Sequence, residues 1–551
     1  MSKNKMWTIF LSVILISVLA IAGCSNNEAN TPSNNKNVAP NDEKKDTSEV
    51  VEPEERGDIT VSVYDRGSVP PEEGTIDKNR WTDFLIENGP ADVEFVVIPR
   101  WESREKYNVL FASGGAPDLV FEFDTTYRNS LITQKQLMPI NDLIEEHSVE
   151  YKALLEQYPI LRKLATRADG NMYEFGRLNG LGTNHLLWVR EDWLENVGLP
   201  VPTTTEELYA VLDAFVNDDP DKNNKKDTLG MGVSFVGGNL LNQMFQDVNY
   251  KIQGDTIVRT WENSFAKSTF IKKLYTDKLI DQDFLTDNGG EKAKQDFITG
   301  KLGVYGVNGG DAFNIFEGLK TNVPTAKVIA IPLPASEFGQ FGPVINNPAQ
   351  GTAVINANAK DPVAVMKYVD FLVRESTMMT LNYGIEGEHY KINDKGCAVP
   401  IDVDKNKIEQ NWNSDMRMLV SPALFGDCRH KKNEYDANNP LHKEFIDLIE
   451  QADAAYLNPA TPLAELTHGE HMPVLPDDLK LIITNSQEQM TAFYQQALLG
   501  GSKYTVEQAE KDAKAFWEKA GGPKVDAWYA EWYKTSGQDA ILAKDLYELK
   551  F

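Results

Sequence analysis

Oxygen-bearing side chains recur at alternate positions in the segment Asp219–Gly230, DPDKNNKKDTLG. Positions 1, 3, 5 and 9 of this run are held by Asp219, Asp221, Asn223 and Asp227. A tight loop needs this spacing to direct several oxygens at one hard cation, with a backbone carbonyl at position 7, here that of Lys225. The spacing matches the opening of an EF-hand loop and predicts a structural Ca²⁺ site.

The same segment departs from an EF-hand loop at two positions. Asn224 stands at position 6, where the sharp turn prefers Gly, although Asn tolerates the left-handed conformation better than most residues. Gly230 stands at position 12, so the bidentate carboxylate is missing, and the Thr228 hydroxyl or water would have to complete the shell. A polar turn stabilised by Asn and Asp side chains is the alternative, and the spacing alone leaves both open.

A positive start and a short apolar run precede Cys24. Two lysines are followed by 17 uncharged residues, Met6 to Ala22, and Gly23 stands directly before the cysteine. This is the layout of a secretory signal, and the segment resembles a bacterial lipobox, which implies cleavage before Cys24 and a diacylglyceryl thioether on its sulfur. The alternative is an uncleaved anchor, because this run lies at the lower limit for spanning a bilayer. Two acyl chains would hold the protein at the outer face of the cell membrane.

Residues 24–57 are rich in Asn, Glu, Lys and Pro and contain no aromatic residue. Such a stretch cannot bury enough apolar surface to offset its chain entropy, so we expect a disordered tether. The body over 58–551 is too long for one core and is expected to form two lobes. The net charge of −27 excludes a typical nucleic-acid partner, which requires a basic surface.

Strand-like and helix-like segments alternate along this body. β-branched and apolar runs predict strands over 59–64, 93–98, 118–121, 186–189, 302–305, 328–331 and 352–355. Helices are expected between them over 81–87, 101–112 and 205–216, and beyond about residue 360 over 363–374, 440–455 and 506–519. Glycine-rich stops between strands and helices are typical of a parallel α/β sheet.

Two cysteines, Cys397 and Cys428, remain when Cys24 carries a lipid. They would lie in a compartment where disulfides persist. A bridge and two free thiols both fit the sequence, because spacing along the chain does not fix the distance between the two Cα atoms.

Several segments between residues 112 and 533 follow the pattern of one family in the same order. They are Ala112–Asp118, where Gly115 replaces the Asp of the family's ASGDxPD turn, then Asp169–Tyr173, Leu187–Leu194, Val197–Thr203, Tyr383–Tyr390, Phe516–Gly522 and Trp528–Tyr533. Together they resemble the bacterial extracellular solute-binding proteins of carbohydrate importers, in particular the large lipoproteins that bind oligosaccharides.

The resemblance implies an α/β fold of the periplasmic-binding-protein type, with two lobes, a hinge, a cleft between the lobes and a helical C-terminal region. It implies a monomer, not an enzyme, that captures an oligosaccharide and delivers it to the permease subunits of an ABC importer. Family members hold calcium in the loop after the stretch Leu187–Thr203. The implied ligands are Asp219, Asp221, Asn223, the Lys225 carbonyl and Asp227, with Thr228 beside them.

Candidate ligand contacts follow from the strand ends, since α/β proteins present residues to a crevice there. Sugar sites pair a flat aromatic face with planar polar side chains for the hydroxyls. Trp101 follows the strand 93–98, and Phe123 and Asp124 follow the strand 118–121. A glycine-rich turn ends the strand that starts at residue 302 and lets backbone approach a ligand; it offers Tyr305, Asn308 and Asp311.

Glu388 and His389 lie in the segment Tyr383–Tyr390 and are further candidates; an ordered loop that only packs is the alternative there. The ligand class stays open. Neutral oligosaccharide, uronate fragment and peptide are expected in that order.

A secreted glycoside hydrolase and a sugar-sensing receptor module are the alternative functions. Among 82 acidic residues some carboxylate pair at catalytic spacing is certain, so their number is uninformative. The segment His468–His471 is not the HExxH pattern of zinc peptidases. Reducing sugars released from an oligosaccharide would indicate an enzyme, whereas unchanged, saturably bound sugar would indicate a carrier.

Overall fold

The computed structural model describes residues 56–287, 289–468 and 471–550. The expected export segment 1–23, Cys24 and the expected tether as far as residue 55 lie outside the described residues. The last two residues of that tether belong to the folded body instead. Arg56 donates hydrogen bonds to the carbonyls of Gly89 and Ala91, each at 2.7 Å, and the first strand begins at Gly57.

The first lobe contains a five-stranded sheet in the order β2-β1-β3-β11-β4. Its strands are β1 (Gly57–Asp65), β2 (Ala91–Pro99), β3 (Leu119–Phe121), β4 (Glu174–Leu178) and β11 (Ala349–Ile355). Alternate residues of β1, namely Ile59, Val61 and Val63, are at most 2% exposed and belong to the core of this lobe.

Helices pack on this sheet, and a small two-stranded hairpin belongs to the same lobe. The helices are α1 (Arg80–Asn88), α2 (Ser103–Ser113), α3 (Thr125–Thr133), α4 (Asn141–His147), α5 (Glu150–Gln157), α6 (Pro159–Ala165), α13 (Pro362–Val373), α14 (Glu375–Tyr383) and α15 (Val403–Glu409). The hairpin pairs β12 (Tyr390–Ile392) with β13 (Ala398–Pro400). A capping box fixes the start of α1, because the Asn79 and Thr82 side chains each accept from the other's backbone N–H.

The second lobe contains a four-stranded sheet in the order β10-β5-β9-β6. Its strands are β5 (His185–Arg190), β6 (Leu229–Met231), β9 (Leu302–Asn308) and β10 (Val328–Ala330). The helices around it are α7 (Glu191–Val197), α8 (Thr205–Asn217), α9 (Val236–Met244), α11 (Glu291–Ile298), α12 (Ala312–Asn322) and α16 (Pro440–Tyr456).

Long C-terminal helices form a separate hydrophobic cluster with the hairpin β7 (Tyr250–Gln253) and β8 (Thr256–Arg259). They are α17 (Asp477–Leu499), α18 (Val506–Ala520) and α19 (Gly522–Ser536), and α10 (Trp261–Thr276) packs beside them. The expected helical C-terminal region is therefore confirmed. Within the described part of the chain, no helix is both long and apolar enough to cross a bilayer.

Both sheets are mixed, so the expected parallel sheet was only partly right. β1 is parallel to β2 and β3, but β11 is antiparallel to β3 and β4, and β5 is antiparallel to β9 and β10. The reason is the path of the chain. The chain leaves the first sheet at the end of β4 and returns to it at the start of β11, so β11 must run in the opposite direction to its neighbours.

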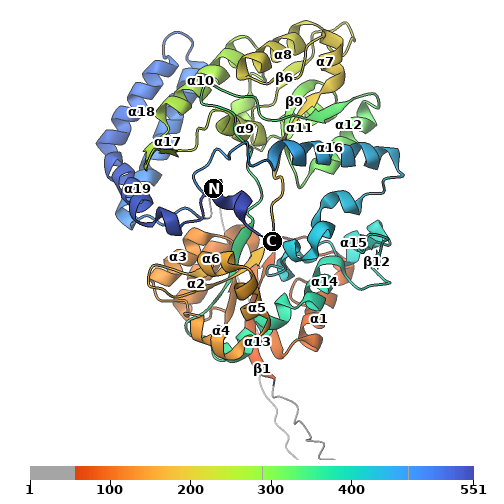
Figure 1. Ribbon diagram of the computed structural model, residues 1–551, viewed down its shortest axis with the longest axis vertical. Helices are drawn as coiled ribbons and strands as arrows, with labels where there is room; N and C mark the ends of the chain where they lie inside the picture. Colours follow the sequence, from red (N-terminus) through yellow and green to blue (C-terminus); the bar gives the residue numbers. More distant parts are fainter. Residues whose placement is uncertain (1–55, 288, 469–470, 551) are drawn as a thin grey trace, which may run out of the picture. The chain divides into compact units, whose positions relative to one another are not determined.

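Two of the segments that cross between the lobes, 179–184 and 331–348, lie side by side (Figure 1). Thr183 forms a β-bridge with Ile345, and the Asn346 N–H donates to the Gly182 carbonyl at 2.9 Å. The two lobes and their hinge are confirmed. The carboxyl ends of β1, β3, β4 and β9 all point toward these crossings.

Candidate ligand-binding site

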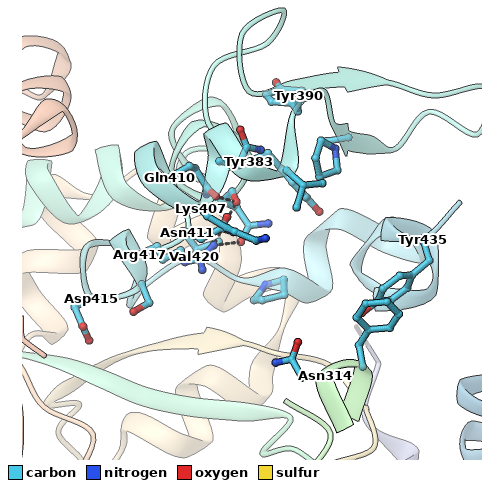
Figure 2. Close-up of a pocket in the computed structure, with 18 of the residues that line it drawn as sticks. Asn314, Tyr383, Tyr390, Lys407, Gln410, Asn411, Asp415, Arg417, Val420 and Tyr435 are labelled. Atoms are coloured by element: carbon cyan, nitrogen blue, oxygen red, sulfur yellow. Dashed lines mark hydrogen bonds between the residues drawn. The ribbon is translucent and has the colours of Figure 1, made fainter. Parts of the chain in front are cut away.

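A cavity of about 930 Å³ lies between the two lobes. The first lobe contributes Arg66 after β1, Phe123 after β3 and Arg177 on β4, whereas α12 of the second lobe contributes residues of its first two turns. The remaining wall comes from α14, the β12–β13 hairpin, α15, the segment that follows it and the first turn of α16. We call this space the interlobe cavity; Figure 2 shows part of its wall.

Aromatic rings and amides dominate the wall of the interlobe cavity. The Phe313 and Tyr435 rings are 4.8 Å apart, and Tyr383 and Tyr390 lie 5.9 Å apart on another part of the wall. In Figure 2, Tyr435 and Asn314 face open space from the second lobe's side. The amides are Asn314, Asn382, Asn406, Gln410 and Asn411. Such a surface suits a ligand with apolar ring faces and many hydroxyls.

A disulfide joins two parts of this wall. Cys397, directly before β13, is bonded to Cys428, and their Cα atoms are 5.2 Å apart. Ala398 and Pro400 on one side and Pro422 on the other line the cavity. Of the two possibilities that the sequence left open, the structure contains the bridge, and it ties the hairpin to the segment after α15.

Charged residues also reach the cavity. Arg66 forms a two-point ion pair with Asp415, with Nε–Oδ2 at 2.6 Å and Nη2–Oδ1 at 2.9 Å, and the Asp415 carboxylate raises the pKa of Arg66. Arg177 donates to Gln350 Oε1 at 3.0 Å, and Arg417 donates to Asn382 Oδ1 at 3.1 Å. An Arg–Asp pair can bind a sugar hydroxyl through both partners, because one donates and the other accepts.

Among the described residues that line the cavity, Phe123 is the only one of the predicted ligand contacts. Trp101 is 79% exposed and lies beside the cavity, with the Arg66 guanidinium 5.9 Å from its ring centroid. Asp124 caps α3 by accepting from the Tyr127 N–H and pairs with Arg104. These roles of Asp124 explain its position without a ligand.

Of the predicted contacts in β9 and the turn after it, Asp311 lies next to the cavity wall. Asp311 accepts from Asn314 Nδ2 at 2.9 Å and pairs with Lys294, so it positions a lining residue. Asn308 accepts from the Gly310 N–H. Tyr305 stacks on Phe297 at 5.0 Å and packs against the core of the second lobe. A direct ligand contact by these three stays a prediction.

Glu388 and His389 belong to an ion-pair network that holds their loop. His389 is fully buried, its Nδ1 accepts from the Ile385 N–H, and its Nε2 faces Glu409 at 3.2 Å. Arg80 contacts Glu409 at 2.7 Å, and Lys405 contacts Glu388 at 3.1 Å.

The accepted hydrogen bond places the His389 proton on Nε2, and burial lowers its pKa. Glu388, His389 and Glu409 have ligand atoms within 4.8 Å of one another. However, the proton on Nε2 and two neighbouring cations favour a packed loop over a metal site.

The loop between α8 and β6 places its acidic side chains around Asn223. Asn223 Nδ2 donates to Asp221 Oδ2 at 2.7 Å and to Asp227 Oδ1 at 3.2 Å, and the Asn223 and Asn224 N–H groups donate to the Asp219 carboxylate. Burial raises the pKa of Asp221, and the nearby Asp219 and Asp227 raise it further. This convergence of carboxylates fits a calcium ion.

Backbone geometry explains both departures from an EF-hand loop. Asn224 has φ = 61°, the left-handed conformation that position 6 requires. Gly230 lies in β6, where an added Cβ would be 2.7 Å from the Leu279 carbonyl oxygen, so a glutamate cannot stand there. The Thr228 hydroxyl donates to the Phe215 carbonyl at 2.8 Å and is buried, so it ties the loop to α8.

Sequence reasoning missed much of the cavity wall. Arg66 lines the cavity and directly follows β1, so the strand-end argument that selected Trp101 and Phe123 could have selected it as well. Nothing in the sequence indicates that Asn314 lies opposite the segment after α15. That relationship arises only from the packing of the two lobes.

Two lobes around a polar cavity between them are the architecture of solute-binding proteins. Residues 80–379 match the family of bacterial extracellular solute-binding proteins, and the chain belongs to this family. The expected membership is confirmed.

Two curated relatives come from Bacillus subtilis. The polygalacturonan/rhamnogalacturonan-binding protein YtcQ is 25% identical over 459 residues, which is 81% of this chain and 86% of the relative. Lipoprotein LipO is 25% identical over 542 residues, which is 93% of this chain and 95% of the relative.

Solved structures share the fold. The substrate-binding protein FusA of Streptococcus pneumoniae in complex with kestose superposes with a TM-score of 0.63 at 18% identity, covering 88% of this chain and all of FusA. Another FusA structure is described as an EF-hand mutant in complex with fructo-nystose, with a TM-score of 0.61, 18% identity and the same coverage.

Proposed function

We propose that this protein captures an oligosaccharide in the interlobe cavity and delivers it to an ABC-type permease. The observation that carries the proposal is the cavity itself. It has about 930 Å³, takes its walls from both lobes, and is lined by aromatic rings and amides. Rings can cover the apolar faces of pyranoses or furanoses, and amides can satisfy hydroxyls.

The relatives support a saccharide ligand. YtcQ is named for polysaccharide binding, and FusA is described with kestose bound. The family is one of binding proteins, so we propose no catalysis and keep the glycoside hydrolase as the alternative to test.

The remaining parts of the proposal concern position and stability. A diacylglyceryl group on Cys24, detectable by palmitate labelling, would hold the monomeric protein at the outer face of the membrane, and the LipO relative is named a lipoprotein. A calcium ion held by Asp219, Asp221, Asn223, the Lys225 carbonyl and Asp227 would fix the α8–β6 loop. The EF-hand described for FusA supports this ion.

Isothermal titration against a panel of neutral and acidic oligosaccharides tests the function. We expect saturable binding of at least one sugar, and chromatography should recover that sugar unchanged after prolonged incubation. Shortened sugars in the recovered material would indicate the hydrolase. Binding of no saccharide in the panel would contradict the proposed ligand class.

A further inference from the structure

Guanidinium groups and aromatic rings gather at one edge of the first sheet, where β1, β2, β3 and β4 all end. Arg66, Arg100 and Phe123 follow β1, β2 and β3, and Arg177 precedes the last residue of β4. Trp101 stands next to Arg100. We call Arg66, Arg100, Trp101, Phe123 and Arg177 the strand-end cluster; three of them line the interlobe cavity.

Arg100 is the centre of this cluster. Its guanidinium carbon lies 4.8 Å from the Tyr64 ring centroid, 5.3 Å from that of Phe123 and 5.6 Å from that of Trp101. The other two arginines share these rings, with Arg177 5.7 Å from Phe123 and Arg66 5.9 Å from Trp101. Three guanidinium groups therefore meet at the Phe123 and Trp101 rings, with Arg100 between the other two.

The arginines of this cluster differ in their partners. Asp415 neutralises Arg66. Within the part of the chain that the structure describes, Arg100 has no ion pair with a carboxylate, and its buried Nε has no hydrogen-bond acceptor. Of the described cavity-lining residues, four are cationic, namely Arg66, Arg177, Lys407 and Arg417, and two are acidic, Glu317 and Asp415. This positive surface lies in a protein whose net charge is −27.

The chemistry of the cluster separates acidic from neutral sugars. Guanidinium groups only donate hydrogen bonds, and they match a carboxylate in shape and charge. A hydroxyl could accept one such bond, but it would leave the positive charge uncompensated. Trp101, 79% exposed, offers a flat face beside the guanidinium that a pyranose ring could cover.

We propose that the ligand is an acidic oligosaccharide, with a uronate carboxylate bound by Arg100 between Arg66 and Arg177 and its pyranose ring against Trp101. The inference rests on the proposed function and specifies its ligand class. It reverses the expected order of neutral and uronate ligands.

Trigalacturonate and its full methyl ester are the matched probes, because esterification removes the negative charges and keeps the sugar ring and linkage. Isothermal titration of the wild-type protein should show trigalacturonate binding at least tenfold tighter than the ester. Equal or tighter binding of the ester, or of a neutral sugar, would overturn the acidic ligand while leaving the oligosaccharide function in place. Binding of neither probe nor any other saccharide would overturn both.

Arg100→Gln tests the assigned residue. It should reduce the acid-to-ester preference at least tenfold, whereas Arg100→Lys, which keeps the charge, should retain part of it. Arg374→Gln is the matched control, because it removes the same charge from a surface arginine that faces Glu150. An unchanged preference in Arg100→Gln, or an equal loss in Arg374→Gln, would overturn the role of Arg100. If Arg100→Gln fails to fold, the wild-type comparison of the two probes still decides the ligand class.

Discussion

Arg66 and Asp415 stand 349 residues apart in the sequence and form a two-point ion pair in the wall of the interlobe cavity. The Asp415 side chain is 3% exposed, whereas that of Arg66 is 30% exposed. The pair joins the residue after β1 to the segment after α15. It therefore fixes the late part of the chain to the edge of the first sheet.

Breaking this pair should destabilise the ligand-free protein. Arg66→Gln would leave a buried carboxylate without its partner, so we expect a loss of about 1–3 kcal/mol in the free energy of unfolding. Asp415→Asn in the same chain should recover part of that loss, and denaturant titration of the double-mutant cycle measures the coupling. The exposed pair Lys407–Asp404 is the control, with a coupling below about 1 kcal/mol. Additive effects at Arg66 and Asp415 would contradict the pairing.

The disulfide should stabilise both the fold and the cavity. It closes a loop between residues 31 apart, so Cys397→Ser with Cys428→Ser should cost about 3–4 kcal/mol by loss of the cross-link. Reductant should lower the melting temperature of the wild-type protein and leave the double variant unchanged. Ligand affinity should fall as well, because the bond holds lining residues of the hairpin in place. A melting curve that reductant does not shift would contradict the bridge.

Calcium should stabilise the folded protein through the α8–β6 loop. Binding to the folded state alone contributes about 2.7 kcal/mol at 100-fold excess over Kd, so a chelator should lower the melting temperature and calcium should restore it. Magnesium should restore little, since it resists an irregular shell. Asp219→Asn should abolish the calcium response. Asp255→Asn, in the exposed turn between β7 and β8, is the matched control and should keep it.

The pH dependence of this response follows from Asp221, whose pKa is raised by burial and by the neighbouring carboxylates. Without calcium, the folded chain takes up a proton at Asp221 more readily than the unfolded chain, so acidification through that pKa stabilises the ion-free loop. Protons compete with calcium for the same carboxylate. The calcium-dependent rise in melting temperature should therefore shrink between about pH 7 and pH 4. A constant rise across this range would argue against Asp221 as a ligand.

The fold could be predicted further than the site. β-branched runs such as Ile59–Tyr64 indicated strands because strand propensity and burial are local properties, and β1 and β2 extend only a residue or two beyond the expected bounds. Strand direction was missed because the reversal of β11 depends on the chain returning from the second lobe. The left-handed Asn224 was predictable from its position in the loop, since the turn requires that conformation.

The cavity depends on distant packing, which the sequence does not encode locally. Phe123 was found because it follows a strand, and Trp101, chosen for the same reason, lies beside the cavity. Asn314 and Tyr435 line the cavity because α12 faces the segment before α16. No spacing of residues in the sequence predicts that contact. Glu388 and His389 stood in a recognisable segment, but their partners Arg80 and Lys405 could be identified only in the structure.

Closure of the lobes on the ligand is the remaining prediction. A ligand shifts an open–closed equilibrium only through contacts that differ between the two states, and the cavity has walls from both lobes. Small-angle scattering should therefore show a smaller radius of gyration with saturating ligand than without it. An unchanged scattering curve across every saturably bound sugar would contradict closure.

Asn314 on α12 tests which contact drives this closure. It is exposed and lies on the second lobe's wall, so Asn314→Ala should weaken binding by about 1–3 kcal/mol, the cost of a ligand group left without its partner. The melting temperature of the ligand-free protein should barely change, because Asn314 faces solvent there. Asn322→Ala is the control, because it removes the same exposed side chain from the other end of the same helix. Full affinity in Asn314→Ala, or an equal loss in Asn322→Ala, would place the contact that drives closure elsewhere in the wall.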